Sequence, residues 1–397
     1  MRLSPRIAHI AGGGSDGWEI YYRTRDMVEA GERVLNLTIG EPDIKTDPAI
    51  LKAMHDSAMA GNTGYTFGAG KRALREAIAA RVTTRTGVPT GWRSVVITPG
   101  GQAALYAVHM VLLAEGDAGL YCDPYYATYP GTIRATGADA LAVPTRPEDA
   151  FAPTEGAIAE VALAAGGRAR TLLINTPKTP AGTVYARATL DVIGRAAAAH
   201  DLWIVSDEVY ETQVWEGEHL SPRALPELVG RTVVIGSMSK GHAMTGSRLG
   251  WVVGPEEVVE AVTTLATSST YGVVPFIQDA ALFALAQGEA FEEAVAAPFR
   301  RRRGIALQAL AGSNAVRPVP PQGAMYLMLD IRATGLSGAA FADALLTEER
   351  IAVMPGESFG RASAGHVAVA MTIDDAAFAE AIRRLAAFAE RRLPARS

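Results

Sequence analysis

The sequence has very little cysteine, since Cys122 is the only one among 397 residues. A single thiol excludes an intrachain disulfide and favours a reducing compartment, so we expect a cytoplasmic protein. Charge is also modest, with 20% charged residues and a net charge of -5. This mild acidity gives no electrostatic reason to expect a nucleic-acid partner.

Long apolar runs are missing as well. No run approaches the roughly 20 residues of a transmembrane helix, and residues 1–10 lack the apolar core of a signal peptide, so we expect no membrane association. The seven histidines are scattered without a His-Glu-x-x-His pattern, and no metal site is predicted. What the chain does have is 49% hydrophobic residues and enough length for two domains with sizeable cores.

The most informative stretch surrounds Lys240. It lies between the runs Thr232–Ile235 and Leu249–Val253, which are typical of buried strands because they are rich in β-branched residues. A lysine just past a buried strand is partly desolvated, which favours the neutral amine that can form a Schiff base with a carbonyl. Ser237 and Arg248 flank it, and hydroxyls with a guanidinium suit a phosphate. A carbonyl carrier with a phosphate is pyridoxal 5'-phosphate.

The alternative is that Lys240 is an ordinary surface lysine. The chain contains only five lysines, which makes an incidental lysine at this position less expected.

A carboxylate at the end of the apolar run 202–206 is the second strong signal. A buried Asp207 would be costly unless it met a cation, and a protonated pyridine nitrogen is such a cation. A helix N-cap would also explain Asp207, but it would not explain the spacing to Tyr210 and Lys240.

A glycine turn after the buried run 94–98 predicts a phosphate cradle at Gly101, Gln102 and Ala103. A helix that starts there presents free N–H groups and the positive end of its dipole. The pattern alone is weak, because many α/β turns contain two glycines. Further along, the apolar run 119–123 leads into aromatics, and a flat pyridine ring stacks well on an aromatic face.

Together these segments resemble the class I/II aminotransferases, fold-type I enzymes that use pyridoxal phosphate, and the likeness covers nearly the whole chain. The resemblance implies an α/β fold, in which helices sandwich a mostly parallel seven-stranded sheet and a smaller α+β domain is added. We expect an N-terminal arm and part of the small domain over residues 1–44, the large cofactor-binding domain over 45–285 and the small domain over 286–397. A homodimer with shared active sites is also implied.

The resemblance also implies roles for single residues. Lys240 would hold the cofactor, Asp207 would keep its pyridine nitrogen protonated, and Tyr210 would donate to its phenolic oxygen. The other implied cofactor contacts are Gly101, Gln102, Ala103, Tyr126 as the stacking ring, Asn175, Thr179, Ser237, Arg248 and, from the neighbouring subunit, Tyr65.

Two positions depart from the family pattern. Ala368 stands where members carry the arginine that clamps the substrate α-carboxylate, and Thr179 stands where an asparagine donates to the phenolic oxygen. Losing the arginine should weaken binding of an ordinary amino acid by roughly 2 to 5 kcal/mol unless another cation substitutes. The predicted substrate contacts are Gly40, Trp18, Lys178 and His366, and Arg23 and Arg361 are further candidate cations.

The first hypothesis for function is transamination between an amino acid, or a related amine, and a 2-oxo acid, which needs a base beside the reacting carbon. The alternative is a pyridoxal phosphate-dependent lyase, replacement enzyme, cyclase or oxidase of a specialised biosynthetic pathway. A cofactor-binding regulatory domain is disfavoured, because the chain has no room for a DNA-binding module.

Overall fold

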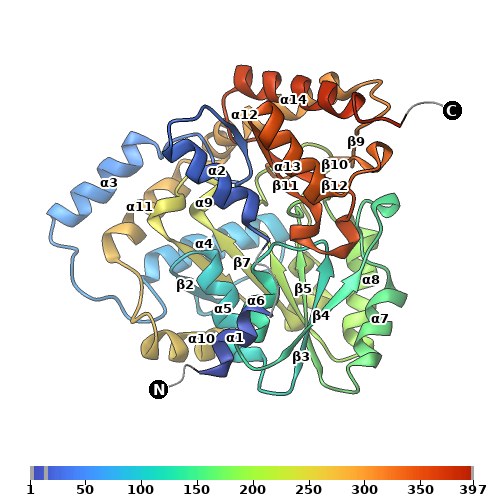
Figure 1. The fold of residues 1–397 in the computed structure, drawn as a ribbon. Helices are drawn as coiled ribbons and strands as arrows, with labels where there is room; N and C mark the ends of the chain where they lie inside the picture. Colours follow the sequence, from blue (N-terminus) through green and yellow to red (C-terminus); the bar gives the residue numbers. More distant parts are fainter. Residues whose placement is uncertain (1–3, 13–16, 395–397) are drawn as a thin grey trace.

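The structure is a computed structural model that describes residues 4–12 and 17–394, and its chain folds around two sheets (Figure 1). The larger sheet has the strand order β2-β8-β7-β6-β5-β3-β4. β8 runs antiparallel to both of its neighbours and all other adjacent strands are parallel. The bounds of its strands are β2 (Val95–Thr98), β3 (Ala118–Asp123), β4 (Asp139–Pro144), β5 (Ala169–Asn175), β6 (Trp203–Asp207), β7 (Thr232–Ser237) and β8 (Gly250–Val253). The predicted mostly parallel seven-stranded sheet is confirmed.

Helices cover both faces of this sheet, because alternate side chains of each strand enter opposite cores. Leu173 and Val205 pack on one face, and Leu172 and Ile204 pack on the other. The first face is covered by α5 (Gly101–Leu112), α6 (Tyr129–Arg134) and α10 (Glu256–Ser268). The second is covered by α3 (Pro48–Met59), α4 (Arg72–Thr86), α7 (Glu155–Ala164), α8 (Arg187–Ala199) and α11 (Pro275–Ala286).

The smaller sheet joins the two ends of the chain. Its order is β1-β11-β12-β10-β9, and the N-terminal β1 pairs in parallel with the C-terminal β11. The strands are β1 (Leu35–Leu37), β9 (Arg317–Pro318), β10 (Tyr326–Asp330), β11 (Ile351–Pro355) and β12 (His366–Ala370). The helices around it are α2 (Glu19–Glu29), α12 (Gly288–Leu310), α13 (Gly338–Glu349) and α14 (Asp375–Glu390), while α1 (Pro5–Ala11) packs against α6. The domain limits at 44 and 285 stay predictions.

The start of β10 follows from the prolines before it. This strand begins only at Tyr326. Pro320 and Pro321 precede it and cannot donate to a ladder, so the pairing starts after them.

The fold brings the predicted site residues to one edge of the larger sheet. Strands β5, β6 and β7 run in parallel and end at Asn175, Asp207 and Ser237, respectively. In open α/β sheets ligands bind beyond the carboxyl ends of the strands. Within residues 4–12 and 17–394, no helix combines the length and the apolar character needed to cross a membrane.

Candidate active site

A cavity of about 310 Å³ lies at the carboxyl ends of β5, β6 and β7. Segments from both ends and the middle of the chain line it. It brings together most of the predicted site residues, namely Trp18, Gly40, Gly101, Gln102, Tyr126, Asn175, Thr179, Asp207, Tyr210, Ser237, Lys240 and Arg248.

Lys240 reaches this cavity from α9 (Met238–Gly241), a single helical turn directly after β7. The Ser237 hydroxyl caps the turn by accepting from the Ser239 N–H at 3.1 Å, so the polar side chains of this segment are held in place. The Lys240 Nζ donates to the carbonyl oxygen of Gly40. Burial lowers the pKa of Lys240 to about 8, while Glu41 oppositely favours the charged ammonium. A substantial fraction of the amine is therefore neutral near pH 8 and available as a nucleophile.

Asp207 ends β6 and is only 4% exposed. Its Oδ2 accepts a hydrogen bond from the Tyr129 phenol at 2.7 Å, and its Oδ1 accepts from the Val209 N–H at 3.2 Å. Burial raises the pKa of Asp207 to about 6, although both hydrogen bonds oppose that shift. A buried carboxylate at the floor of a cavity suits a cationic ring nitrogen.

A tight cradle formed by glycines surrounds the Arg248 guanidinium. Gly100 caps the N-terminus of α5 with a φ of 89°, and a Cβ there would lie 2.4 Å from the Arg248 Nη2. A Cβ on Gly250 would lie 2.7 Å from the Gly101 nitrogen. With Ser237 and the first turn of α5, these groups suit an anion, and the close approaches at Gly100 and Gly250 require glycine. Ala103 belongs to the same helical turn but does not line the cavity.

Three polar side chains lie where the cofactor ring is expected, and they differ in their hydrogen bonds. The Asn175 side chain makes hydrogen bonds to the backbone at both ends of its amide. Its Nδ2 donates to the Asp207 carbonyl at 2.8 Å, and its Oδ1 accepts from the Thr179 N–H at 2.6 Å. In the part of the chain that the structure describes, the buried Thr179 Oγ1 has no hydrogen-bond partner. Burial raises the pKa of Tyr210 well above its usual value, so its phenol stays protonated as a donor. The Thr179 side chain lies close enough to the Tyr210 phenol to lower its pKa, but burial outweighs this effect.

Tyr326 lines the cavity without having been predicted as a site residue. Its phenolic oxygen accepts from the Gly40 N–H at 2.5 Å, which leaves its own hydrogen available to a bound molecule. Any Cβ on Gly40 would collide with this ring at 2.6 Å. The sequence shows an aromatic residue at the start of β10, but only the folded structure shows that this side chain faces the cavity.

Two predicted substrate contacts do not line the cavity, and the structure corrects them. Lys178 is 2% exposed, and its Nζ donates to the Phe151 carbonyl at 3.3 Å and to the Tyr185 phenol at 3.4 Å. His366 is buried with its Nδ1 3.0 Å from the Ala364 carbonyl oxygen and its ring edge on Phe151. Their neighbours direct both side chains into the core rather than toward Lys240.

Arg23 and Arg361 also lie outside the cavity lining. The Arg23 guanidinium pairs with Asp343 and donates to the Thr347 hydroxyl at 2.7 Å. Arg361 donates its backbone N–H to Asp123 at 2.9 Å. Neither is placed to replace the missing arginine at position 368.

Ala368 lies on the face of the smaller sheet that Tyr326 shares. Tyr326 pairs with Ala370, and Met328 pairs with Ala368, so these four side chains point the same way. Ala368 is fully buried and brings no charge to that face. Among the described residues that line the cavity, Lys240 and Arg248 are the cations, and both are adjacent to the predicted cofactor position.

Tyr65 does not reach the cavity of its own chain. It is 91% exposed and packs edge-on against Tyr271, with 5.1 Å between the ring centres. Phe67, two residues on, is 93% exposed.

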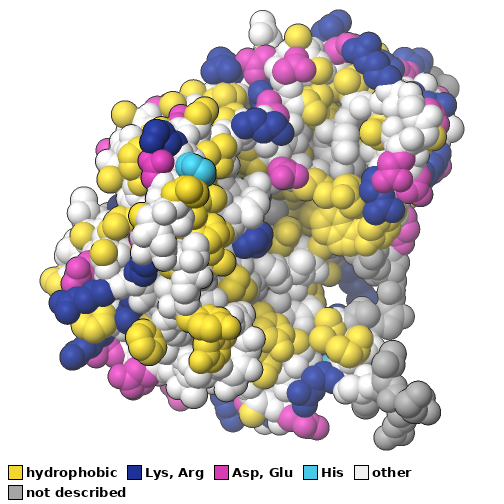
Figure 2. All heavy atoms as spheres, turned by 90° about the vertical axis from the view of Figure 1, so that its left-hand side faces the viewer, with side chains coloured by type: hydrophobic (Ala, Val, Ile, Leu, Met, Phe, Trp, Pro, Cys, Tyr) yellow, Lys and Arg dark blue, Asp and Glu magenta, His cyan; other side chains and the backbone are white. Residues whose placement is uncertain are grey.

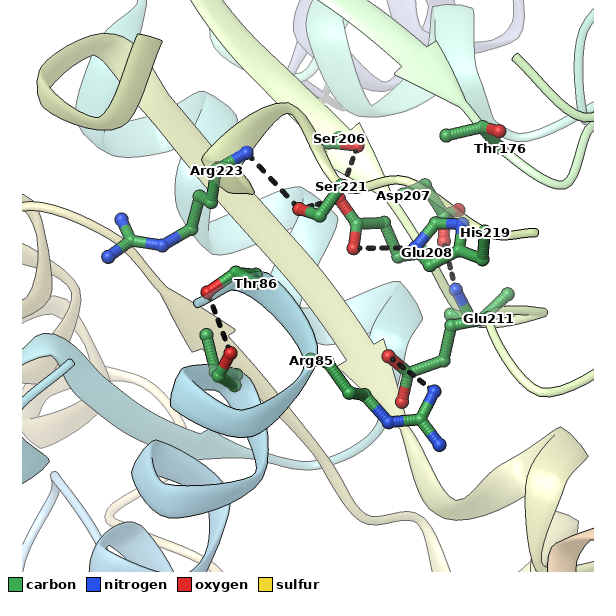
Figure 3. Close-up of polar contacts among 12 residues, drawn as sticks. Arg85, Thr86, Thr176, Ser206, Asp207, Glu208, Glu211, His219, Ser221 and Arg223 are labelled. Atoms are coloured by element: carbon green, nitrogen blue, oxygen red, sulfur yellow. Dashed lines mark hydrogen bonds and ion pairs between the residues drawn. The ribbon is translucent and has the colours of Figure 1, made fainter. Parts of the chain in front are cut away.

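A buried polar network lies behind Asp207 (Figure 3). The Glu208 Oε1 accepts from the hydroxyls of Ser206 and Ser221 at 2.8 Å each, and its Oε2 lies 3.0 Å from the His219 Nε2. Glu211 pairs with Arg81 at 2.9 Å. The network holds the segment that carries Asp207 and Tyr210.

Glu208, Glu211 and His219 offer ligand atoms within 4.8 Å of one another, which is close enough for a metal ion. Burial raises the pKa of the Glu211 carboxyl, but the charges of Arg81 and Arg85 outweigh burial and lower this pKa to about 2. Because this carboxylate is already neutralised by two guanidinium groups, we assign the cluster no metal. The absence of a metal site stays a prediction.

The comparison with known families bears directly on this geometry. Residues 32–385 match the family described as aminotransferase class I and II. The chain belongs to this family. The aminotransferase is 43% identical over 386 residues to the arginine–pyruvate transaminase AruH of Pseudomonas aeruginosa, covering 97% of this chain and 98% of that relative. It is 34% identical over 365 residues to the aspartate/prephenate aminotransferase of Thermus thermophilus, covering 91% of this chain and 92% of that relative.

The fold gives the same result. The structure of the Thermus thermophilus aspartate aminotransferase with maleate matches this aminotransferase with a TM-score of 0.90 and 31% identity, over 98% of this chain and 100% of that one. The predicted fold, family and cofactor are confirmed. The protein is a pyridoxal phosphate-dependent enzyme that moves an amino group between an amino acid and an oxo acid.

The residues of this aminotransferase fit the cofactor. The glycine cradle with Arg248 suits its phosphate, buried Asp207 suits its ring nitrogen, and the unpartnered Thr179 hydroxyl faces the same cavity. When bound, the cofactor supplies a carbonyl group for amines and a ring that accepts electrons from the carbon whose C–H bond breaks.

Proposed function

We propose that Lys240, Asp207 and Tyr210 are the catalytic residues of this aminotransferase and that both half-reactions use the one cavity. Lys240 would hold the cofactor at its carbonyl carbon and would move the proton at the reacting carbon of the substrate. Asp207 would keep the ring nitrogen protonated, and Tyr210 would donate to the phenolic oxygen. The observation that carries the proposal is the convergence of these three side chains in one cavity, with the pKa of Lys240 lowered by burial to about 8.

The phosphate is assigned to Ser237, Arg248 and the first turn of α5 with Gly101 and Gln102. The fixed guanidinium and the free N–H groups of a helix start are matched to a dianion. Tyr126 lines the same cavity and is assigned to stack on the ring, whereas Asn175 shapes the floor through its two backbone hydrogen bonds.

Borohydride reduction of the holoenzyme tests the lysine assignment. Mass spectrometry of the digested protein should find the reduced cofactor on the peptide that contains Lys240. Lys240→Ala should bind the cofactor without this bond and lose activity by at least ~10²- to 10⁴-fold, the usual size of a lost acid–base group. Labelling of Lys178 instead would overturn the assignment.

A donor panel tests the reaction. The names of the relatives select arginine and aspartate as first donors and pyruvate as first acceptor. Transamination predicts that mixing the holoenzyme with a donor alone leaves pyridoxamine phosphate and an oxo product. Release of ammonia with no pyridoxamine phosphate would instead indicate the lyase chemistry named above.

The active form is proposed to be a homodimer in which Tyr65 reaches the phosphate of the other subunit. Figure 2 views the side on which α3 and α11 lie, and hydrophobic side chains are spread across it. Tyr65, Phe67 and Tyr271 together line a pocket of about 290 Å³ near these helices. Exposed aromatics of this size are typical of a covered surface.

Tyr65→Phe tests this role with little change in packing. Removing the hydroxyl should weaken cofactor retention by about tenfold, measured by dialysis, while light scattering still gives a dimer. Tyr271→Phe, in the same cluster, should retain the cofactor normally. A monomeric wild-type protein with full activity would contradict the proposal.

We place the reaction in the cytoplasm, which the chemistry of Cys122 supports. This is the only cysteine of the sequence, and burial raises the pKa of its thiol. A buried, protonated thiol is inert and needs no partner.

A further inference from the structure

A second hollow, of about 450 Å³, lies beside the cofactor cavity. Trp18 and Gln102 belong to the walls of both. The Gln102 Oε1 accepts from the Thr128 hydroxyl at 2.9 Å, which ties α5 to the loop before α6 at this common wall. A substrate long enough to pass Trp18 and Gln102 would therefore extend from Lys240 into the second hollow.

Among the described residues, no carboxylate pairs with the guanidinium that lines the hollow. Arg134, the last residue of α6, is half-buried and lines it where α1 packs on α6 (Figure 1). Its Nη1 lies against Gly12, where a Cβ would approach it to 2.2 Å. Across residues 4–12 and 17–394 the Arg134 side chain has neither an ion pair nor a hydrogen bond. A half-buried arginine is usually paired, so this one is available to an anion.

Glu357 is the other charged residue among those described that line the hollow, and its carboxylate already accepts hydrogen bonds. Its Oε1 accepts from the backbone N–H groups of Gly338 at 2.9 Å and Gly365 at 3.2 Å. Its carboxylate is thus turned toward the smaller sheet and its helices. Arg134 is therefore the group of the hollow that favours an anionic ligand.

The cofactor cavity has the opposite character. Lys240 and Arg248 are assigned to the cofactor, Ala368 is neutral, and Glu41 adds a carboxylate to the lining. A carboxylate on the amine-bearing carbon would find no unassigned cation there among the described residues. A carboxylate at the far end of the same molecule would reach Arg134.

We propose that the amine substrate is an ω-amino acid whose terminal amine reacts at Lys240 and whose distant carboxylate binds Arg134. The inference rests on the proposed transamination. The amino group leaves the terminal carbon, which becomes an aldehyde, and the carbonyl of the 2-oxo acid acceptor becomes the new amine. Arg134 is the specificity-determining residue, because a guanidinium holds both oxygens of a carboxylate at once.

Matched donors test the proposal in the holoenzyme. 5-Aminopentanoate carries its carboxylate at the far end, norvaline carries it on the amine-bearing carbon, and pentylamine has none. 4-Aminobutanoate and 6-aminohexanoate extend the series in length. We expect the best ω-amino acid to exceed norvaline in kcat/KM by roughly 10- to 100-fold, as one charged hydrogen bond provides. Norvaline or arginine as the best donor would overturn the proposal.

Arg134→Gln separates charge recognition from structure. It should lower kcat/KM for the best ω-amino acid by roughly 10-fold or more and leave pentylamine, the absorption spectrum and Tm unchanged. Arg93→Gln, at an exposed arginine on Trp92, should change none of these. An equal loss with pentylamine would make Arg134 structural and refute its role. If the holoenzyme accepts an amino group from no donor at all, transamination itself fails, which is a different result.

Discussion

The phenol of Tyr129 donates a hydrogen bond to the Oδ2 of Asp207 at 2.7 Å and joins two groups 78 residues apart in sequence. Tyr129 is 3% exposed and sits at the start of α6, and Asp207 ends β6. The bond orients the carboxylate without supplying a charge. Lys240 partly offsets the charge of Asp207, but burial still raises the pKa of this carboxyl, so a further cation in the cavity would stabilise the carboxylate.

This arrangement predicts the pH dependence of the apoenzyme. Burial raises the pKa of Asp207 from 3.8 to about 6, so between these values the folded chain binds more protons than the unfolded chain. The contribution of Asp207 to the stability of the apoenzyme should fall as pH rises from about 4 to 6, by roughly 3 kcal/mol. The difference in unfolding free energy between the wild type and Asp207→Asn, measured by urea unfolding at pH 4.5 and pH 8, isolates this contribution from the other titrating groups.

The same variant should lose activity, because the amide cannot keep the ring nitrogen protonated. A loss of ~10²- to 10⁴-fold in kcat is expected. Adding cofactor should stabilise the wild type more than Asp207→Asn at pH 8. If the cofactor stabilised the wild type and Asp207→Asn equally, Asp207 would not interact with the ring nitrogen.

Glu41 should set the pH at which Lys240 becomes reactive. Burial lowers the pKa of Lys240 to about 8, and Glu41 favours the charged form. The rate at which the apoenzyme takes up the cofactor should thus rise with pH around a midpoint near 8, since the neutral amine is the nucleophile. Glu41→Gln should move that midpoint lower, and stopped-flow absorbance measures both. A midpoint that moves higher would contradict this electrostatic coupling.

The glycine cradle should not tolerate a methyl group. Gly100 has a φ of 89°, and a Cβ would sit 2.4 Å from the Arg248 guanidinium. Gly100→Ala should weaken cofactor affinity by at least about tenfold, because the cost of displacing the phosphate ligand is of order 1–3 kcal/mol. Gly91→Ala, where a Cβ would meet nothing within 4 Å, is the matched control. Fluorescence titration of the apoenzymes compares the two.

Restoring an amide at position 179 should change the colour of the holoenzyme with pH. Thr179 Oγ1 is buried without a hydrogen-bond partner in the described chain. An amide donor from Thr179→Asn would compete for the electrons of the cofactor's phenolic oxygen and lower the pH midpoint of the visible absorption change. Thr179→Val, which removes the hydroxyl, should move it the other way. No shift in either variant would place this side chain out of reach of that oxygen.

A cation at position 368 should change substrate preference. Ala368 shares a sheet face with Tyr326, which lines the cavity. Ala368→Arg should improve kcat/KM for α-amino acids such as norvaline by about tenfold or more and lower Tm, because an unpaired guanidinium is buried when no substrate is bound. Ala368→Leu supplies bulk without charge and should lower Tm without improving norvaline.

The sequence by itself determined the fold class and most of the residues that gather at the cavity. Lys240, Asp207 and Asn175 each follow or end a buried apolar run, and parallel strands bring their carboxyl ends to one edge of a sheet. The spacing along the sequence is enough to place such residues, because the end of the strand fixes where each of them lies in the sheet. Their catalytic roles stay proposals.

Only the tertiary structure decided which side chains are hydrogen-bonded to the site residues and which predicted residues do not line the cavity. The direction of a side chain after helices and sheets have packed decides three features. These are the hydrogen bond from Tyr129 to Asp207, the place of Tyr326 in the cavity and the lack of a partner for Arg134 among the described residues. Tertiary contacts also explain why Lys178 and His366 do not line the cavity. Both side chains pack in the core against Phe151, which is distant in sequence. Spacing along a strand or loop carries no information about neighbours from other segments, and those neighbours set burial, charge balance and reach.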